Sequence, residues 1–133
     1  MRFLDYIMNL FTILIVSYIK TSKATDAIYI CESEDPIFLG TYAVSREMMD
    51  GVHVYSNAND MSFFRNKGFW YIGNLAPWPP ETHYRCVEQE GCNYEGTFPP
   101  TSAEGEWKGV KSFGKTKGPL ISTTPCEGGN EEL

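Results

Sequence analysis

The stretch 61–73 constrains the fold more than any other part of the chain. It contains two runs rich in aromatic residues, 61–65 and 69–73, separated by the short turn segment Asn66-Lys67-Gly68. Gly68 can adopt the positive φ that the last position of a three-residue hairpin loop requires. Aromatic pairs between neighbouring strands stabilise a sheet by about 0.2–1 kcal/mol each. We therefore expect an antiparallel hairpin here, in the middle of a small sheet.

Short strand-forming runs recur on both sides of this hairpin. The further expected strands are 27–31, 37–44, 51–56, 82–87, 92–95 and 106–113. Turn signals separate them, as in Asn57-Ala58-Asn59-Asp60, and for 45–50 the pattern allows one helical turn. No sustained helical period follows the N-terminal stretch. The sequence predicts an all-β fold, a small antiparallel twisted sheet or meander.

The N-terminal 24 residues have the three-part layout of a secretory signal peptide. Arg2 begins a short basic start, 7–19 is largely apolar, and Ser22-Lys23-Ala24 is a small-x-small cleavage site. Thr25-Asp26-Ala27 is a second candidate site. The apolar core has thirteen residues, whereas a membrane-spanning helix needs about 20. We expect cleavage and no membrane span afterwards; an uncleaved anchor is the alternative.

The chain after the signal peptide has room for one domain with a modest core. We expect a single β domain over 25–113 and a flexible tail over 114–133 that is pinned at Cys126. Of the 11 basic and 17 acidic residues, cleavage leaves 8 and 16, a net charge of −8. Such a surface repels nucleic acid and anionic membranes, so we expect neither as a partner.

Four cysteines follow the signal peptide, and an even number in a small secreted chain indicates disulfides. Three pairings are possible, and we favour Cys86–Cys92 together with Cys31–Cys126. In the chain-entropy model the longer loop contributes about 4.7 kcal/mol and the shorter one roughly 2.4 kcal/mol. A zinc site is a poor alternative because the spacing gives no C-x-x-C. We expect no metal and no cofactor.

The most interesting surface candidate is Trp78, which lies among Pro77, Pro79 and Pro80. A stiff exposed aromatic side chain binds a sugar ring or a protein pocket at low entropy cost. The alternative is that Trp78 folds back over the core. Tyr55 is a further candidate binding residue. Four lysines predict a positive edge suited to a sulfated glycan or an acidic partner: Lys108, Lys111, Lys115 and Lys117.

No catalytic arrangement is recognisable. A nucleophilic hydrolase would need Ser or Cys near His and a carboxylate, and the two histidines, His53 and His83, lie in no such motif. Glu32, Glu34 and Asp35 are close enough in sequence to bind Ca²⁺ weakly, but they lack EF-hand spacing, and a solvated turn is the better interpretation. We therefore expect no enzymatic activity.

Short segments between 38 and 107 follow one another in a recurring order: Gly40-Thr41-Tyr42, Val54-Tyr55-Ser56-Asn57, Phe64-Arg65, Phe69-Trp70-Tyr71-Ile72-Gly73, Tyr84, Pro99-Pro100 and Gly105-Glu106-Trp107. Together they resemble a small module that recurs, singly or in tandem, in secreted and multidomain eukaryotic proteins. The pattern of that module is roughly Asn-Gly-x-Tyr, Val-Tyr-x-Asn, Trp-x-Ile and a closing Pro followed by Trp. The resemblance implies an extracellular β module and no particular site.

The expected function is that of a secreted, non-catalytic binding or structural module in an extracellular matrix, coat or recognition role. Its expected partner is an extracellular protein or glycan. A secreted effector or toxin-like protein is the alternative, because a signal peptide and disulfides fit it equally well. A small secreted enzyme is a third possibility, and it would require His53 or His83 to meet a carboxylate in a pocket.

Overall fold

The computed structural model describes residues 27–87, 92 and 96–127. Within them the chain forms eight β-strands and two short 3₁₀-helices and contains no α-helix, so the all-β prediction is confirmed. The elements are β1 (Ala27–Glu32), η1 (Pro36–Phe38), β2 (Gly40–Met49), β3 (Val52–Ser56), β4 (Ser62–Asn66), β5 (Phe69–Asn74), β6 (Glu81–Cys86), β7 (Trp107–Gly109), η2 (Lys111–Phe113) and β8 (Leu120–Ser122). The predicted signal peptide lies outside the described residues.

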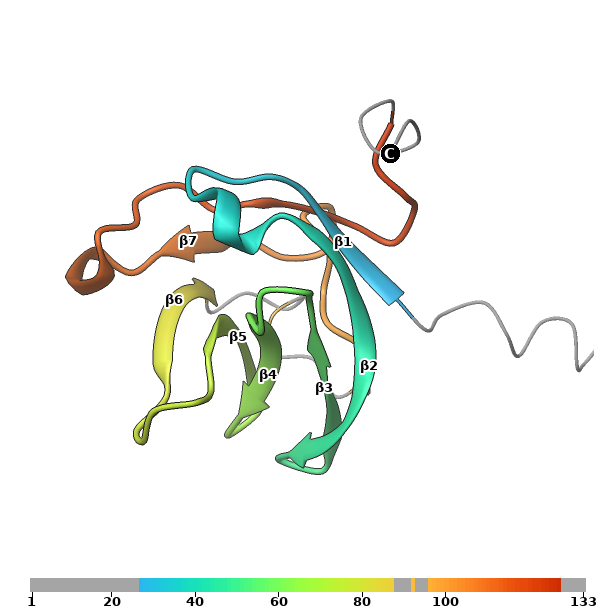
Figure 1. Cartoon of the computed structure of the whole chain (residues 1–133), viewed down its shortest axis with the longest axis vertical. Coiled ribbons are helices and arrows are strands. Elements are labelled where there is room, and N and C mark those ends of the chain that lie inside the picture. The colour runs from blue at the N-terminus through green and yellow to red at the C-terminus, as the bar shows by residue number, and fades with distance from the viewer. Residues whose placement is uncertain (1–26, 88–91, 93–95, 128–133) are drawn as a thin grey trace, which may run out of the picture.

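All eight strands belong to one antiparallel sheet with the order β7-β6-β5-β4-β3-β2-β1-β8. Strands β1 to β7 form a meander, in which each strand pairs with the next, and β8 returns to pair with the free edge of β1. The sheet curls strongly (Figure 1). Its two edges approach one another, because an isolated bridge pairs Lys108 of β7 with Lys117, just before β8.

The β4–β5 hairpin lies in the interior of the sheet, as predicted. Asn66 pairs with Phe69, so the loop has two residues, Lys67 and Gly68, with φ of 54° and 87°. Positive φ at both central positions is the signature of a type I′ turn, whose twist matches that of the flanking strands. The prediction of a three-residue loop was therefore wrong by one residue, although Gly68 has the expected conformation.

Strand β2 continues through Met49, so the helical turn considered for 45–50 does not form. Met48 pairs with His53 and Met49 with Val52, after a register shift that begins beyond Val44. The pairing with β3 decides the conformation here, because a segment this short has little intrinsic helical stability. The strand expected at 92–95 falls largely on residues outside the described part of the chain.

Aromatic rings fill the concave side of the curled sheet. Trp70, Tyr42, Tyr84 and Phe63 are fully buried. The rings of Tyr42 and Phe63 meet edge to face at 4.9 Å between centroids. Phe63 in turn meets Trp107 at 5.7 Å. Such pairs contribute about 0.5–1.5 kcal/mol beyond the apolar area that they bury. The core therefore joins strands from the centre and the edge of the sheet.

The segment 114–133, predicted to be a flexible tail, contributes a strand to the sheet. Ile121 of β8 pairs with Ile30 and is only 2% exposed. Its backbone N–H also donates to the Ser102 hydroxyl at 2.7 Å. The domain thus extends beyond the predicted boundary at 113, at least to Ser122. Conversely, the strand expected over 106–113 ends at Gly109 and is followed by η2.

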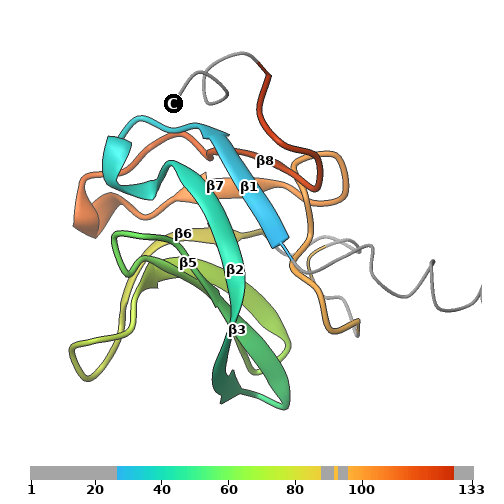
Figure 2. The same ribbon diagram turned by 45° about the vertical axis from the view of Figure 1, so that its right-hand side comes forward.

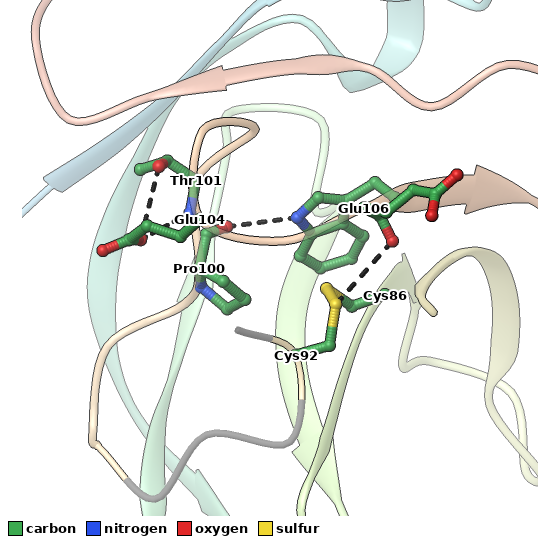
Figure 3. Close-up of a disulfide and its surroundings, with 7 residues drawn as sticks. Cys86, Cys92, Pro100, Thr101, Glu104 and Glu106 are labelled. Carbon is green, nitrogen blue, oxygen red and sulfur yellow. Dashed lines mark hydrogen bonds between the residues drawn. A yellow bond between two sulfur atoms is a disulfide. The ribbon is translucent and has the colours of Figure 1, made fainter. Parts of the chain in front are cut away.

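Both favoured disulfides are present, and the described part of the chain has no free cysteine. Cys31–Cys126 joins residues 95 positions apart, and Cys86–Cys92 closes a separation of six. Figure 3 shows the shorter bridge beside the loop that precedes β7, where the Cys92 sulfur lies 3.7 Å from the Glu106 carbonyl oxygen. Here the Trp107 indole N–H donates to the Pro100 carbonyl at 3.1 Å. The longer bridge fastens the segment after β8 to β1, and the shorter one fastens the end of β6 to the segment that follows it.

Candidate functional site

A groove on the side of the sheet opposite the core is the strongest candidate for a binding site. It has a volume of about 410 Å³, within the range of about 300–1,000 Å³ that is typical of small-molecule sites. The residues that line it, here called the Trp78 groove, come from the end of β2, from β4 to β6 and from the β5–β6 loop: Met49, Phe64, Asn66, Tyr71, Trp78, Pro79, Pro80 and Thr82.

Two stacked rings lie within the Trp78 groove. Phe64 and Tyr71 are cross-strand partners, and their rings stack at 5.8 Å between centroids with an interplanar angle of 26°. Phe63 belongs to the core cluster, and successive side chains of a strand point to opposite faces. Phe64 therefore points to the outer face, yet it is only 2% exposed. The groove thus contains one buried ring and one half-buried ring.

The β5–β6 loop forms one wall of the groove. In both views this loop projects beyond the strands (Figure 1 and Figure 2). Trp78 is 85% exposed, so it does not fold back over the core. Three prolines restrict the backbone around it, and the Asn74 side chain accepts a hydrogen bond from the Ala76 N–H at 3.0 Å. The loop therefore holds the indole ring out in solvent.

Gly73 determines how the two ends of this loop meet. A Cβ atom at Gly73 would collide with the backbone carbonyl of Glu81. The register between β5 and β6 also shifts between Ile72 and Gly73. Glycine is the residue that permits such a close backbone approach. The position of Trp78 at the groove thus depends on the absence of a side chain at Gly73.

The lining of the Trp78 groove is uncharged. Five of its eight residues have side chains without a titratable group or an amide or hydroxyl: Met49, Phe64, Trp78, Pro79 and Pro80. The other three, Asn66, Tyr71 and Thr82, supply one amide and two hydroxyl groups. Trp78 adds an indole N–H, which is a hydrogen-bond donor only. This arrangement can pack against apolar rings and donate several hydrogen bonds.

Tyr55 does not belong to this site. It is 6% exposed and part of the core cluster. Its ring packs edge to face against Phe98 at 5.2 Å between centroids. The expectation that Tyr55 is a surface binding residue was therefore wrong: its partner across the strand pair is Phe63, which faces the core.

The four lysines do not form one exposed positive edge. Lys115 is only 8% exposed. Its Nζ donates to the Phe113 carbonyl at 3.1 Å, lies 3.4 Å from an Asp35 carboxylate oxygen and 5.7 Å from the centroid of the Phe38 ring. Lys115 is thus a packing residue. Lys108, Lys111 and Lys117 are exposed, and Lys108 lies 3.8 Å from a Glu106 carboxylate oxygen.

The sequence indicated a solvated turn after β1, but in the structure this acidic turn also makes hydrogen bonds to a distant segment. The Glu34 carboxylate accepts hydrogen bonds from the N–H groups of Thr116 and Lys117. These backbone bonds, the one from Thr116 above all, lower the pKa of Glu34. Asp35 accepts from the Ile37 N–H and so begins η1. Among the described residues no three His, Cys, Asp or Glu side chains are grouped to hold a metal ion.

A second cavity of about 410 Å³ lies between this acidic turn and β8. Its lining includes Glu34, Ser102 and Lys117. The Glu34 carboxylate is already engaged by the backbone, and the Ser102 hydroxyl donates to the Pro119 carbonyl at 3.2 Å. The principal polar groups of this cavity therefore hold the chain together and are a weaker candidate for ligand binding.

Neither histidine lies in the lining of the Trp78 groove. His53 is exposed, and its Nδ1 lies 3.2 Å from the Ser45 carbonyl oxygen. The His83 ring lies 5.2 Å from that of Phe38 and 4.7 Å from that of Phe113, between centroids. Its Nε2 is 3.5 Å from a Glu81 carboxylate oxygen. The surroundings of His83 are therefore mainly those of a packed sheet residue.

Sequence reasoning found Trp78 and its prolines but missed the rest of the groove. The missed residues are Met49, Phe64, Asn66, Tyr71 and Thr82. A signal was available for two of them, because consecutive aromatic residues in a strand must point to opposite faces. One of Phe63 and Phe64, and one of Trp70 and Tyr71, therefore had to lie outside the core.

Comparison of the chain with protein-family models, with curated proteins and with solved structures found no match. Within the described part of the chain, no helix is long and apolar enough to cross a membrane. The resemblance to a recurring extracellular module stays a prediction. The features that bear on function are therefore the Trp78 groove and the disulfide-bonded sheet that carries it.

Proposed function

We propose that this chain is a secreted, non-catalytic binding module that takes an extracellular partner in the Trp78 groove. The observation that carries the proposal is the 85% exposure of Trp78 at the edge of a groove that contains the stacked rings of Phe64 and Tyr71. Two disulfides support a role in an oxidising compartment, because such bonds persist there. The N-terminal signal-like segment supports export.

The loop that carries Trp78 lowers the entropy cost of binding. An exposed tryptophan contributes nothing to the core, and its hydration is lost only when a partner covers it. Binding then orders few bonds, because the prolines and the Asn74 hydrogen bond already restrict the loop. Tryptophan is also among the residues most enriched at binding hot spots, where truncation to alanine costs at least about 2 kcal/mol.

The proposal can be tested with protein secreted from eukaryotic cells. The wild type, Trp78→Ala and Leu120→Ala would be applied to arrays of extracellular protein domains and glycans. Leu120 is the control, because it is an exposed apolar residue that lines the second cavity and not the Trp78 groove. We expect ligands that the wild type and Leu120→Ala bind and that Trp78→Ala does not bind. Equal binding by all three proteins, or no ligand at all, would contradict the proposal.

The same arrays separate the proposed role from the two alternatives. A secreted effector would bind a host or prey protein, so its partner would identify it. An enzyme would need a histidine and a carboxylate beside its substrate, whereas His53 and His83 lie outside the groove lining. No specific observation favours either alternative over a binding module.

A further inference from the structure

We infer that the Trp78 groove binds an uncharged, proline-rich peptide in the extended polyproline II conformation. The inference rests on the proposed function, because it names the ligand class of the same groove. It follows from three properties of the lining: the absence of charge, the predominance of apolar and aromatic surface, and the kind of polar group present.

The absence of charged side chains in the lining disfavours several classes of ligand. None of the eight residues that line the groove is Asp, Glu, Lys, Arg or His. A charged group that enters such a site loses its hydration and gains no ion pair in return. Sulfated glycans, acidic peptides and basic peptides find no charged partner among these eight residues, although Arg85 lies beside Tyr71 in the strand pair, and an uncharged ligand fits the lining best. The exposed lysines 108, 111 and 117 are not in the lining.

The balance of apolar and polar surface separates a proline-rich peptide from a neutral sugar. A sugar presents hydroxyl groups around its whole ring, and those buried without a partner oppose binding. The groove offers one amide and two hydroxyl side chains, from Asn66, Tyr71 and Thr82, besides the Trp78 indole. Its apolar surface instead matches the faces of pyrrolidine rings, which aromatic-lined grooves bind in known peptide-recognition domains.

The hydrogen-bonding groups agree with the same ligand. A polyproline II helix has no internal hydrogen bonds, so its carbonyl oxygens are free to accept. Proline has no N–H, so such a peptide needs donors and offers few. Each polar group of the groove can donate: the Trp78 indole N–H, the Asn66 amide and the hydroxyls of Tyr71 and Thr82. A ligand of acceptors and apolar rings therefore complements this lining.

The rigidity of both the groove and the peptide favours their interaction. The stacked Phe64 and Tyr71 rings are carried by paired strands, and the Trp78 wall is restrained by flanking prolines. The polyproline II helix is itself preformed, so little conformational entropy is lost on binding. The volume of about 410 Å³ accommodates a short segment of such a peptide.

Intrinsic fluorescence provides a direct test. Trp70 is fully buried and Trp107 is 6% exposed, whereas Trp78 is 85% exposed. An acetylated and amidated decaproline peptide added to the secreted protein should therefore shift the emission to the blue, mainly through Trp78, with a saturable dependence on peptide concentration. Nuclear magnetic resonance of the labelled protein should show shifts concentrated at Asn66, Tyr71 and Thr82.

Variants assign the response to the groove. Trp78→Ala and Tyr71→Ala should each weaken peptide binding, measured by calorimetry, by at least about 30-fold, as expected for hot-spot residues. Leu120→Ala should bind like the wild type. The urea midpoint of each variant would be measured first, to show that the variant is folded. Trp78→Phe keeps an aromatic face but loses the indole N–H, so it should bind the peptide with intermediate affinity. Unchanged peptide affinity in folded Trp78→Ala would overturn the inference.

Neutral oligosaccharides form the competing arm of the experiment. A Trp78-dependent response to cellohexaose or chitohexaose, with none to decaproline, would overturn the inference and leave the proposed function standing. Absence of any decaproline response would also overturn it. The proposed function would then be judged separately by the arrays, where it fails only if no ligand depends on Trp78.

Discussion

The Glu34 carboxylate accepts a hydrogen bond from the backbone N–H of Thr116 at 2.9 Å, across a separation of 82 residues. The Thr116 hydroxyl and the Lys117 N–H donate to the same carboxylate, at 3.2 Å and 2.8 Å. This contact fixes the chain that leads into β8 against the turn that follows β1. A single side chain thus helps to hold together the first and last parts of the sheet.

Acid should weaken this contact. The backbone hydrogen bonds lower the pKa of Glu34 in the folded protein, whereas the unfolded value is about 4.3. The stabilisation is therefore fully present above about pH 4.3 and is lost as the pH falls through the lowered folded pKa. Urea unfolding of the wild type and Glu34→Gln should show a stability difference at pH 7 that shrinks at pH 3. Glu47→Gln, at an exposed position of β2, should show no such change.

Asn57 should tolerate no substitution that removes its amide. Its Nδ2 donates to the carbonyls of Ile37 and Leu39, at 3.1 Å and 3.2 Å. Its Oδ1 accepts from the N–H groups of Asn59 and Met61. Asn57→Asp keeps the acceptors but places a carboxylate against two carbonyl oxygens. We expect a loss of about 1–3 kcal/mol for each buried group left without a partner.

Chemical denaturation would measure this loss. Asn59→Ala serves as the control, because Asn59 is exposed and its amide makes a single bond to Ile37. A similar unfolding free energy for Asn57→Asp and Asn59→Ala would show that the two turn asparagines are equivalent and that burial does not matter here.

Truncation of Trp70, in β5, should destabilise the protein far more than truncation of Trp78, in the β5–β6 loop. Trp70 is fully buried, so Trp70→Ala should lower the free energy of unfolding by about 3–5 kcal/mol. Trp78→Ala should change it little, because that side chain is 85% exposed. Thermal unfolding followed by circular dichroism compares them directly. A large loss for Trp78→Ala would mean that its ring supports the fold.

Gly73→Ala should disturb the loop that carries Trp78. The added methyl group would meet the Glu81 carbonyl, so β5 and β6 would have to separate. We expect a lower melting temperature and weaker decaproline binding in the same variant. Gly114→Asn is the control for loss of a glycine without a collision: Gly114 has open space, and its φ of 74° lies in the left-handed region, where asparagine is enriched among non-glycine residues. Normal stability of Gly73→Ala would indicate that the loop ends can move apart freely.

The parts of the fold that the sequence predicted follow from local chemistry or from the small number of possible cysteine pairings. The β4–β5 hairpin follows from Gly68 and its aromatic flanks. Four cysteines allow only three pairings, and the favoured one is present, although Cys31 and Cys126 are 95 positions apart. For Trp78 the sequence left both an exposed ring and a ring folded over the core open, and the structure shows the exposed ring.

The parts that escaped prediction depend on contacts between distant segments. Strand β8 is a run of only three residues within a segment rich in Gly, Lys, Ser and Thr, and the free edge of β1 supplies its pairing. Lys115 is buried because Asp35 and the Phe38 ring lie beside it, not because of any feature of its own neighbourhood. The Trp78 groove likewise requires the end of β2 to meet the outer face of the β4–β5 hairpin. Such juxtapositions are set by register, which a local pattern does not specify.

The pairing of β8 with β1 has a consequence for how the protein is made. Because the ribosome adds residues in order, the meander up to β7 can assemble while Leu120–Ser122 is still being synthesised. Throughout that interval the outer edge of Ala27–Glu32 presents unsatisfied backbone groups to any neighbouring nascent chain. Folding of the sheet is thus complete only when Leu120–Ser122 pairs with β1, and a truncation before Leu120 would leave the edge of β1 without its partner strand.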